Sequence, residues 1–263
     1  MLQFLSFIVW DASPEIFRIP GVISVRWYGL MWALGFIVSR QVGLYIFLKE
    51  GRYTEGLHTL FLYIIIPAFI GARLAHFLFY DFDVFIDNPL VLVMPPFHGF
   101  SSHGGTFGIL VGVYIWCYRH KASYIHILDM LCIVTCVVAG LIRFGNLMNS
   151  EVFGSVTDLP WAFIFKRVDA MPRHPVQLYE SLFYFLMFFT LLIVWLKAAH
   201  RWREGMMLGI FLITLWSFRF IIEPLKEDPS AAPGGLLIGQ WLSIPFILGG
   251  IFLLLRKRPV TAK

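Results

Sequence analysis

Long apolar stretches alternate with shorter polar connections along the whole chain. Seven of the stretches are long enough to cross roughly 30 Å of hydrocarbon as helices rising about 1.5 Å per residue. They lie at residues 27–48, 58–80, 104–118, 127–145, 176–196, 206–225 and 239–255. The start of the third is the least defined, because two serines and two glycines surround it. This pattern predicts an all-α, polytopic integral membrane bundle of about seven transmembrane helices.

The composition excludes a soluble globular protein. Of the 263 residues, 59% are hydrophobic and 14% are charged, and the mean hydropathy is +0.76. A soluble domain keeps about 25% of its residues charged, because its surface faces water. The net charge of +5 comes mainly from residues between the apolar stretches, so it does not indicate a nucleic-acid partner. With no internal repeat, residues 1–263 are expected to form a single transmembrane domain.

The N-terminal stretch MLQFLSFIVWDASPEIF differs from the seven others. Its apolar run ends at Asp11, which is too soon to cross a bilayer. It lacks the basic flank and the small-residue cleavage site of a secretory signal. The stretch is therefore expected to lie at the membrane interface.

The basic residues of the connections predict the orientation of the bundle. One set of connections with the C-terminus carries Lys49, Arg52, Arg119, Lys121, Lys197, Arg201, Arg203, Arg256, Lys257, Arg258 and Lys263. The opposite set with the N-terminus carries Arg18, Arg26, Lys166, Arg167, Arg173 and Lys226. Eleven against six predicts a cytoplasmic C-terminus and an N-terminus outside. The two longest connections, 81–103 and the insert 146–175, then form an extracytoplasmic head.

The three cysteines all lie inside apolar stretches. Cys132 and Cys136 are four residues apart and share one helical face, but no other metal-binding side chains accompany them. Together with Cys117 they are expected to pack as small buried hydrophobic groups. The sequence predicts no metal site and no disulfide.

Several charged or strongly polar residues lie inside the apolar stretches or at their ends. A charge near the bilayer centre costs roughly 2.5–3.5 kcal/mol on insertion scales, so such residues usually serve a purpose. The set comprises Arg73, His76, His103, Asp129, Arg143, Asn146, Glu180, Arg219 and Glu223. Most of them fall in the predicted outer half of the bundle, which indicates a polar site on one side of the membrane.

Purely structural explanations exist for some of these residues. Arg73 could pair with a carboxylate inside the bundle, and Glu180 could accept hydrogen bonds from a neighbouring helix. Asp129 could cap the start of its own helix. Arg219 and Glu223 are four residues apart on one helical face and could neutralise each other.

The segment from Arg143 to Gly154 concentrates the most chemistry. It places a guanidinium, the amides of Asn146 and Asn149 and the carboxylate of Glu151 at an outer helix end. A guanidinium offers a planar fork of donors that suits a lipid phosphate, and the amides suit headgroup hydroxyls. The alternative is an ordinary polar cap at the interface. His103 also stands out, because the two glycines after it let a ligand approach the backbone closely.

These residues occur in a series of blocks that resembles the bacterial prolipoprotein diacylglyceryl transferase family. The resemblance covers most of the chain, and the order, the spacing and the shared membrane side of the blocks make it specific. The blocks are Trp27–Met31, Gly71–Leu74, Ser102–Gly105, Arg143–Gly154, Arg173–Glu180, Phe218–Glu223 and Gly239–Pro245.

The chain departs from the family pattern at three positions. Ile142 precedes Arg143 where the family has Gly, and Leu147 stands where it usually has Phe. Both are packing positions. Leu215 stands where family members often carry Tyr, so no role of that Tyr carries over.

The resemblance implies transfer of the diacylglyceryl group from phosphatidylglycerol to the lipobox cysteine thiol of a prolipoprotein signal peptide. The products would be a thioether and glycerol phosphate, in the first step of bacterial lipoprotein maturation. No cofactor or metal is implied, and the partners are these two substrates and the membrane lipids. The implied location is the bacterial inner membrane, with the active site towards its outer leaflet.

The resemblance also implies residue roles. His103 would be the general base, and Arg143 and Arg219 would stabilise the leaving phosphate, with Glu223 orienting Arg219. The substrate-binding residues would be Tyr28, Arg73, Asn146, Asn149, Glu151, Gly154, Glu180 and Glu223.

Two other classes of protein compete with this interpretation. A secondary transporter could use intramembrane His, Arg and Glu as a relay, but transporter sites favour the midplane between internal repeats. A structural or assembly subunit could use paired charges to join helices. That reading gives no reason for the His-Gly-Gly motif or for the spacing within 143–154.

Overall fold

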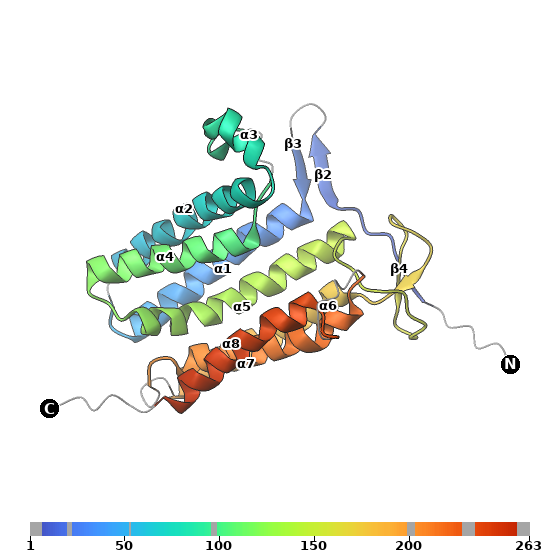
Figure 1. Ribbon diagram of the computed structural model, residues 1–263. Coiled ribbons are helices and arrows are strands. Elements are labelled where there is room, and N and C mark those ends of the chain that lie inside the picture. Colours follow the sequence, from blue (N-terminus) through green and yellow to red (C-terminus); the bar gives the residue numbers. More distant parts are fainter. Residues whose placement is uncertain are drawn as a thin grey trace. The chain divides into compact units, whose positions relative to one another are not determined.

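The computed structural model describes residues 7–19, 23–52, 54–95, 99–198, 203–227 and 235–256. Its long helices confirm the predicted helical bundle (Figure 1). They are α1 (Trp27–Lys49), α2 (Thr54–Phe79), α4 (Ser102–His120), α5 (Tyr124–Asn149), α6 (Val176–Ala198), α7 (Met206–Ile222) and α8 (Ile238–Leu255). Of the basic residues used for the orientation, Arg201, Lys257, Arg258 and Lys263 lie outside the described residues.

Within the described residues, six helices are long and apolar enough to cross a membrane. They are α1, α2, α5, α6, α8 and the run Met206–Leu225, which joins α7 to the short helix η3 (Glu223–Leu225). The remaining predicted stretch is α4, whose 19 residues begin with Ser-His and end with Arg-His. These polar ends lower its average hydropathy, although it forms a continuous helix where one is expected.

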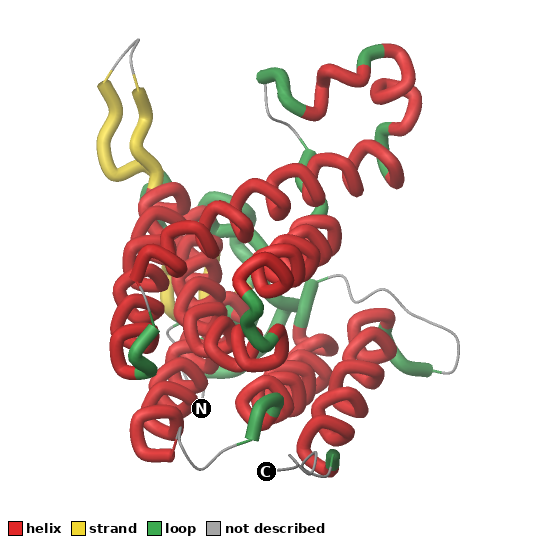
Figure 2. Tube along the Cα trace, turned by 90° about the vertical axis from the view of Figure 1, so that its left-hand side faces the viewer, coloured by secondary structure: helices red, strands yellow, loops and turns green. Residues whose placement is uncertain are grey.

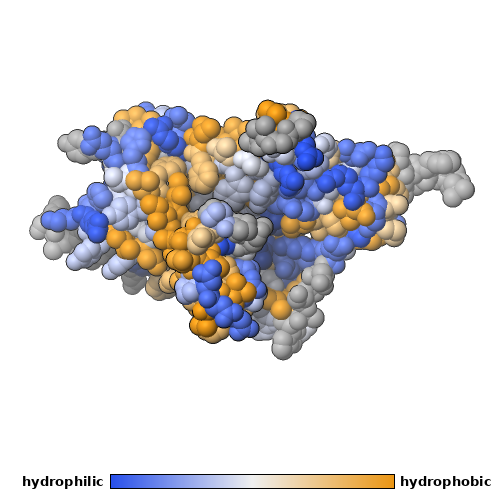
Figure 3. All heavy atoms as spheres, turned by 90° about the horizontal axis from the view of Figure 1, so that it is seen from above, coloured by the Kyte–Doolittle hydropathy of each residue, from blue (hydrophilic) through white to orange (hydrophobic). Residues whose placement is uncertain are grey.

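The helices expose many large apolar side chains, among them Ile37, Leu62, Phe107, Leu186 and Phe252. Orange hydrophobic spheres accordingly lie open on the face seen in Figure 3. A soluble monomer rarely exposes so much apolar surface. Together with the lengths of the helices, this exposure indicates a protein whose helices face lipid.

The chain divides into two compact units, residues 1–42 with 129–263 and residues 43–128. In the first unit α7 and α8 run side by side (Figures 1 and 2). A Cβ at Gly250 would lie only 2.8 Å from the Gly209 carbonyl oxygen, so the two backbones meet at these glycines. Trp216 stacks on Phe246 with ring centroids 4.1 Å apart. Small residues thus allow close helix packing, as is usual in lipid.

Asp129 joins α5 to α7 within the first unit. Its two carboxylate oxygens accept hydrogen bonds from the backbone nitrogens of Gly205, at 2.6 Å, and Leu208, at 2.7 Å. The expected cap on its own helix is wrong, because α5 already begins at Tyr124. Asp129 instead caps α7, where its charge also opposes the positive end of the helix dipole.

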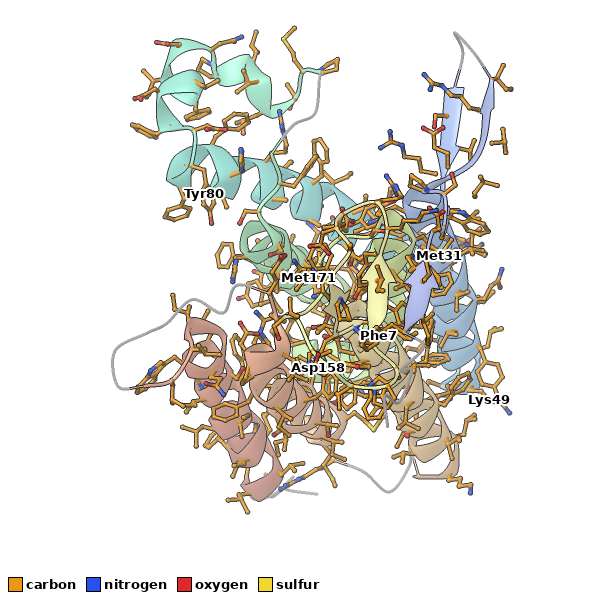
Figure 4. The ribbon with its side chains drawn as sticks, turned by 90° about the vertical axis from the view of Figure 1, so that its right-hand side faces the viewer. Phe7, Met31, Lys49, Tyr80, Asp158 and Met171 are labelled. Carbon is orange, nitrogen blue, oxygen red and sulfur yellow. The ribbon has the colours of Figure 1, made fainter. Side chains whose placement is uncertain are left out.

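In the second unit α2 and α4 run side by side (Figure 1), and glycines of α4 line their contact. A Cβ at Gly104, Gly108 or Gly112 would overlap a backbone carbonyl of α2. Gly112 lies against the Tyr63 carbonyl, which has no helical donor because Pro67 lacks an N–H. After α2, the chain forms α3 (Phe82–Asp87) and η1 (Pro89–Leu92), which extend beyond Tyr80 in Figure 4.

Two small sheets belong to the first unit. Strand β1 (Ile8–Trp10) runs parallel to β4 (Phe163–Phe165), which pairs antiparallel with β5 (Pro172–Arg173). Strands β2 (Glu15–Ile19) and β3 (Ile23–Arg26) form an antiparallel pair before α1, yellow in Figure 2. The N-terminal stretch is thus part of a sheet from residue 8, and not only an interfacial segment, while residues 1–6 lie outside the described residues.

The three-stranded sheet is attached to the end of α5. Leu147, Phe163 and Phe165 are buried together, and the Trp10 indole nitrogen donates to the Leu147 carbonyl at 3.0 Å. The connection that carries β4 and β5 includes the labelled Asp158 and Met171 in Figure 4. Leu147, which departs from the family pattern, therefore has a packing role, and the sheet fixes the chain that follows α5.

Candidate active site

The segment 143–154 forms the end of α5 and a tight turn. Helix α5 continues to Asn149, four residues beyond the predicted end, so Arg143, Asn146 and Asn149 recur every three residues along one side of it. Ser150 (φ 55°) and Val152 (φ 58°) then adopt left-handed backbone. This conformation is rare for a β-branched residue such as Val152 and usually marks a constrained site.

The turn returns the Glu151 carboxylate to the end of the helix. One of its oxygens accepts from the Asn146 amide at 2.8 Å and from the Asn149 amide at 3.2 Å. The Gln177 amide, from α6, donates to the Glu151 backbone carbonyl at 3.1 Å. The predicted residues Asn146, Asn149 and Glu151 therefore form one hydrogen-bonded group, and Gln177 is a member that sequence reasoning missed.

The amide oxygens of this group remain available. Those of Asn146, Asn149 and Gln177 are buried and accept no hydrogen bond from the described residues. A buried acceptor without a partner is unfavourable. Three such oxygens on side chains that bond to Glu151 make the group suitable for a ligand that donates hydrogen bonds, such as one bearing hydroxyls.

Arg143 contacts a carboxylate on the neighbouring helix α6. Its Nε lies 2.7 Å from Glu180 Oε2; the Glu180 side chain is 1% exposed and that of Arg143 is 22% exposed. The pair neutralises the guanidinium while leaving part of it accessible. The assignment of Glu180 to substrate binding stays a prediction; in this structure its buried carboxylate lies against Arg143.

Lys226 adds a second positive charge to this pair. Its Nζ lies 2.9 Å from Glu223 Oε2 and 3.8 Å from Glu180 Oε1. Sequence reasoning counted Lys226 only as a basic residue of a connection. The signal that could have found it is its position three residues after Glu223, where helical geometry brings the two side chains together.

The expected ion pair between Arg219 and Glu223 does not form among the described residues. Glu223 is paired with Lys226, whereas Arg219 Nε is buried and has no hydrogen-bond partner in the described part of the chain. The Arg219 guanidinium lies over the Trp216 ring, 5.6 Å from its centroid. The neighbouring Phe218 stacks on Phe183 of α6 with ring centroids 3.8 Å apart, so this part of α7 packs against α6. Arg219 therefore lies on a helix that packs on the one carrying Glu180, and its Nε donates to no partner among the described residues.

Gly154 and Tyr28 both take part in tight backbone packing within the first unit. The Gly154 nitrogen donates to the His174 carbonyl at 2.8 Å, and a Cβ at Gly154 would lie 2.6 Å from the His174 Cβ. Only glycine fits there. Tyr28, from α1, packs on Gly145, where a Cβ would lie 3.0 Å from the Tyr28 ring. Burial lowers the pKa of His174, which favours its neutral form.

Two predicted site residues belong to the second unit. His103 is the second residue of α4; its side chain is exposed and makes no hydrogen bond with the described residues. Arg73 is 1% exposed and donates to the backbone carbonyls of Val91, Leu92 and Gly99. The assignment of Arg73 as a substrate contact stays a prediction; in this structure its guanidinium is buried and bonded to backbone.

No group of three His, Cys, Asp or Glu side chains suited to a metal ion occurs in the part of the chain that the structure describes. Cys117, Cys132 and Cys136 are buried, as expected.

The apolar helices and the cluster of Arg143, Glu180, Lys226 and Glu223 define a multi-pass membrane protein with a charged site at its helix ends. Residues 14–256 match the model of the family described as prolipoprotein diacylglyceryl transferase. The chain belongs to this family and is a transferase. Membership does not support the secondary-transporter alternative.

The curated relatives cover almost the whole chain. The phosphatidylglycerol–prolipoprotein diacylglyceryl transferase of Bacteroides fragilis is 36% identical over 96% of this chain and 96% of its own. The protein of that name from Chloroherpeton thalassium is 41% identical, over 96% and 95%. The one from Tolumonas auensis is 40% identical, over 94% and 96%.

Proposed function

We propose that the protein transfers the diacylglyceryl group of phosphatidylglycerol to the lipobox cysteine thiol of a prolipoprotein. The sulfur bonds to the glyceryl carbon as the bond from that carbon to the phosphate oxygen breaks. The thiol proton goes to a base on the protein, and the electron pair of the broken bond leaves with glycerol phosphate. The observation that carries the proposal is the partly exposed Arg143 guanidinium, held by Glu180 one helical turn from the Asn146–Glu151 group.

Arg143 is assigned to the phosphate. The leaving group gains a negative charge during the reaction, so a fixed cation stabilises the transition state more than the bound lipid. Arg219 is assigned to the same role, because its buried Nε has no partner within the residues that the structure describes. Glu180 positions Arg143. Glu223 pairs with Lys226 and not with Arg219, which the family resemblance had assigned it to orient.

The headgroup is assigned to Tyr28, Asn146, Asn149, Glu151 and Gly154. Phosphatidylglycerol carries two free hydroxyls on its headgroup, and hydroxyl donors match the unpartnered amide oxygens of Asn146 and Asn149. Glu151 fixes both amides, so these oxygens are oriented before the lipid binds. The acyl chains remain in the surrounding membrane.

His103 is assigned as the general base. A cysteine thiol has an ordinary pKa of about 8.5 and must lose its proton to attack. Histidine is the side chain best suited to accept a proton near neutral pH. The exposed, unpaired imidazole of His103 and its place in the family motif support this assignment, which rests on chemistry and resemblance.

The reaction needs a defined membrane side. We place the site towards the outer leaflet of the bacterial inner membrane, with the N-terminus outside and the C-terminus in the cytoplasm. The basic residues of the connections support this orientation. Reporter fusions should place the connection 197–205 in the cytoplasm and 146–175 outside. A cytoplasmic signal from a fusion within 146–175 would overturn both the topology and the side of the site.

The central test is reconstitution. Purified protein is incubated with phosphatidylglycerol and a lipobox peptide, and mass spectrometry follows the peptide. A diacylglyceryl adduct on the cysteine is expected, with none on a Cys-to-Ser peptide.

His103→Gln should insert and fold but turn over roughly 10²–10⁴ times more slowly, the usual contribution of a positioned base. Turnover of His103→Gln near the wild-type rate would remove His103 from the mechanism.

A further inference from the structure

The buried Arg73 connects α2 to two pieces of backbone that follow it in the second unit. Its Nε donates to the Leu92 carbonyl at 3.3 Å, one terminal nitrogen donates to Val91, and the other donates to Gly99 at 3.4 Å. Val91 and Leu92 belong to η1, and Gly99 lies three residues before α4 begins. A single side chain thus fixes both the η1 segment and the approach to α4.

Other contacts hold the same approach against α2. The Ser101 nitrogen donates to the Ala72 carbonyl at 3.0 Å, and the His76 ring lies against Gly99, whose φ of +74° favours glycine. The His76 ring is itself held by Asp81, with Nε2 and Oδ2 2.8 Å apart. The Phe100 ring centroid lies 5.5 Å from the Arg73 guanidinium carbon. Residues 99–101 are therefore docked on α2 through backbone and side chains.

His103 follows directly from this docked segment. Ser101 caps α4 by accepting from the Gly104 nitrogen at 3.4 Å, and Gly104 packs on Gly71 of α2. His103 itself is exposed and has no hydrogen bond with the described residues. The position of His103 is therefore set by the residues before it in the chain, which are held against α2. Gly99 is the earliest of these residues, and Arg73 holds its carbonyl.

We infer that Arg73 is a positioning residue for His103. By holding Gly99 and η1 together, it fixes the start of α4 and hence the place from which the imidazole accepts the thiol proton. Three carbonyls are reached from three nitrogens of one planar group, which the single ammonium of lysine cannot reproduce. This inference rests on the proposed function, in which His103 is the base.

A double-mutant cycle tests the inference in the full-length protein. Arg73→Lys, His103→Gln and the double variant are compared with the wild type for kcat and for KM of phosphatidylglycerol. Misplacing a reacting group by about 1 Å can cost up to roughly 10²-fold. Arg73→Lys should therefore lower kcat by about 10- to 100-fold with KM unchanged. In the His103→Gln background, the same substitution should cost almost nothing more, because the base is already absent.

The outcomes separate this inference from the proposed function. If His103→Gln is slow but Arg73→Lys causes the same loss in both backgrounds, Arg73 acts independently of His103 and the inference fails alone. A rise in KM with unchanged kcat would likewise overturn it, since that pattern marks a lipid contact. If His103→Gln turns over like the wild type, the base assignment fails and the inference fails with it.

Two further variants guard against misfolding. Arg119→Lys is the matched control, because Arg119 also joins α4 to α2, donating to the Tyr63 hydroxyl at 2.7 Å. It should retain wild-type kcat; an equal loss there would attribute the effect to general packing and overturn the inference. If Arg73→Lys does not fold, Ser101→Ala replaces it in the cycle. Ser101→Ala should lower kcat by a smaller factor, and this loss should disappear in the His103→Gln background. A loss that persists in that background would contradict the inference.

Discussion

Two arginines on membrane helices illustrate different uses of the same side chain. Arg143, in the first unit, pairs with the buried Glu180 and keeps 22% of its side chain exposed. Arg73, in the second unit, is 1% exposed and its donors go to the backbone carbonyls of Val91, Leu92 and Gly99. Sequence position alone does not predict their different partners, since both are charged residues in the later half of a predicted apolar stretch.

The partners explain the difference. A carboxylate neutralises a guanidinium from one side, so the remaining edge can receive a phosphate. Carbonyls that surround the guanidinium occupy its donors and leave no edge for a ligand. Arg143 is accordingly suited to the chemical step, and Arg73 to holding backbone in place. Substitutions that change the partners should therefore have different effects in the two units.

Arg143→Lys should produce the largest effect on the reaction. The positive charge remains, but the planar fork is lost, and losing one preorganised donor typically costs about 2.7–4 kcal/mol of barrier, or roughly 10²–10³ in rate. The measurement is the single-turnover rate with saturating lipid and peptide, alongside a folding check in detergent. A well-folded Arg143→Lys enzyme within a few-fold of the wild type would refute the phosphate role and remove the contrast with Arg73.

Glu180→Gln should mainly affect stability. It leaves Arg143 and Lys226 without their shared buried carboxylate, and removing one partner of a buried pair costs about 3 kcal/mol. Thermal unfolding in detergent measures the loss. Glu15→Gln is the control, because its pair with the exposed Arg26 is 3.9 Å long and only partly buried. Equal shifts in both variants would mean that the Arg143 pair is no more than a surface contact.

Asp129→Ala tests a carboxylate that, like Arg73, bonds to backbone. Asp129 caps α7 through Gly205 and Leu208, and losing such a cap costs about 0.5–2 kcal/mol. The unfolding temperature should fall while kcat of the folded enzyme stays close to normal. The exposed Asp158, changed to Ala, serves as the control. A strong loss of kcat in folded Asp129→Ala would show that Asp129 takes part in the reaction, like Arg143, and does not only hold backbone.

Arg173 forms a third kind of contact, a partly exposed ion pair with Asp169 that should stabilise the fold less than the buried Arg143 pair. Hydrogen bonds from Arg173 hold the pKa of Asp169 below its ordinary value. The ionised carboxylate therefore contributes stability above its ordinary pKa, and this contribution is lost as the pH falls through the lower folded-state pKa. Because the pair is partly exposed, Asp169→Asn should cost only about 0.2–1 kcal/mol at neutral pH and nothing in strong acid. Unfolding curves at both pH values test this, and a pH-independent cost would contradict the linkage.

The smallest effect is expected from the thiols. Cys117, Cys132 and Cys136 are buried, form no disulfide among the described residues, and do not belong to the charged cluster. A variant with all three changed to Ala or Ser should retain the chemistry with a chelator present. Loss of turnover without loss of folding would show that a thiol or a metal takes part after all.

The sequence by itself determined the helices and the chemistry of the candidate residues. Long apolar stretches allow few alternatives in a membrane, where every backbone group must be bonded within a helix or a closed barrel. The segment 143–154 was recognisable because a guanidinium, amides and a carboxylate rarely gather at a membrane helix end by chance.

The tertiary structure alone decided which partner each polar side chain takes. Glu223 lies near both Arg219 and Lys226 in sequence, yet it pairs with Lys226. Asp129 caps a helix that begins 77 positions further along the chain, at Met206, and β1 finds its partner in β4. Such contacts depend on how helices rotate and pack, and small residues such as Gly104 and Gly209 set that packing without any signal of their chemistry. Local pattern fixes which groups are present, and only their arrangement in space fixes which are neutralised and which remain free to react.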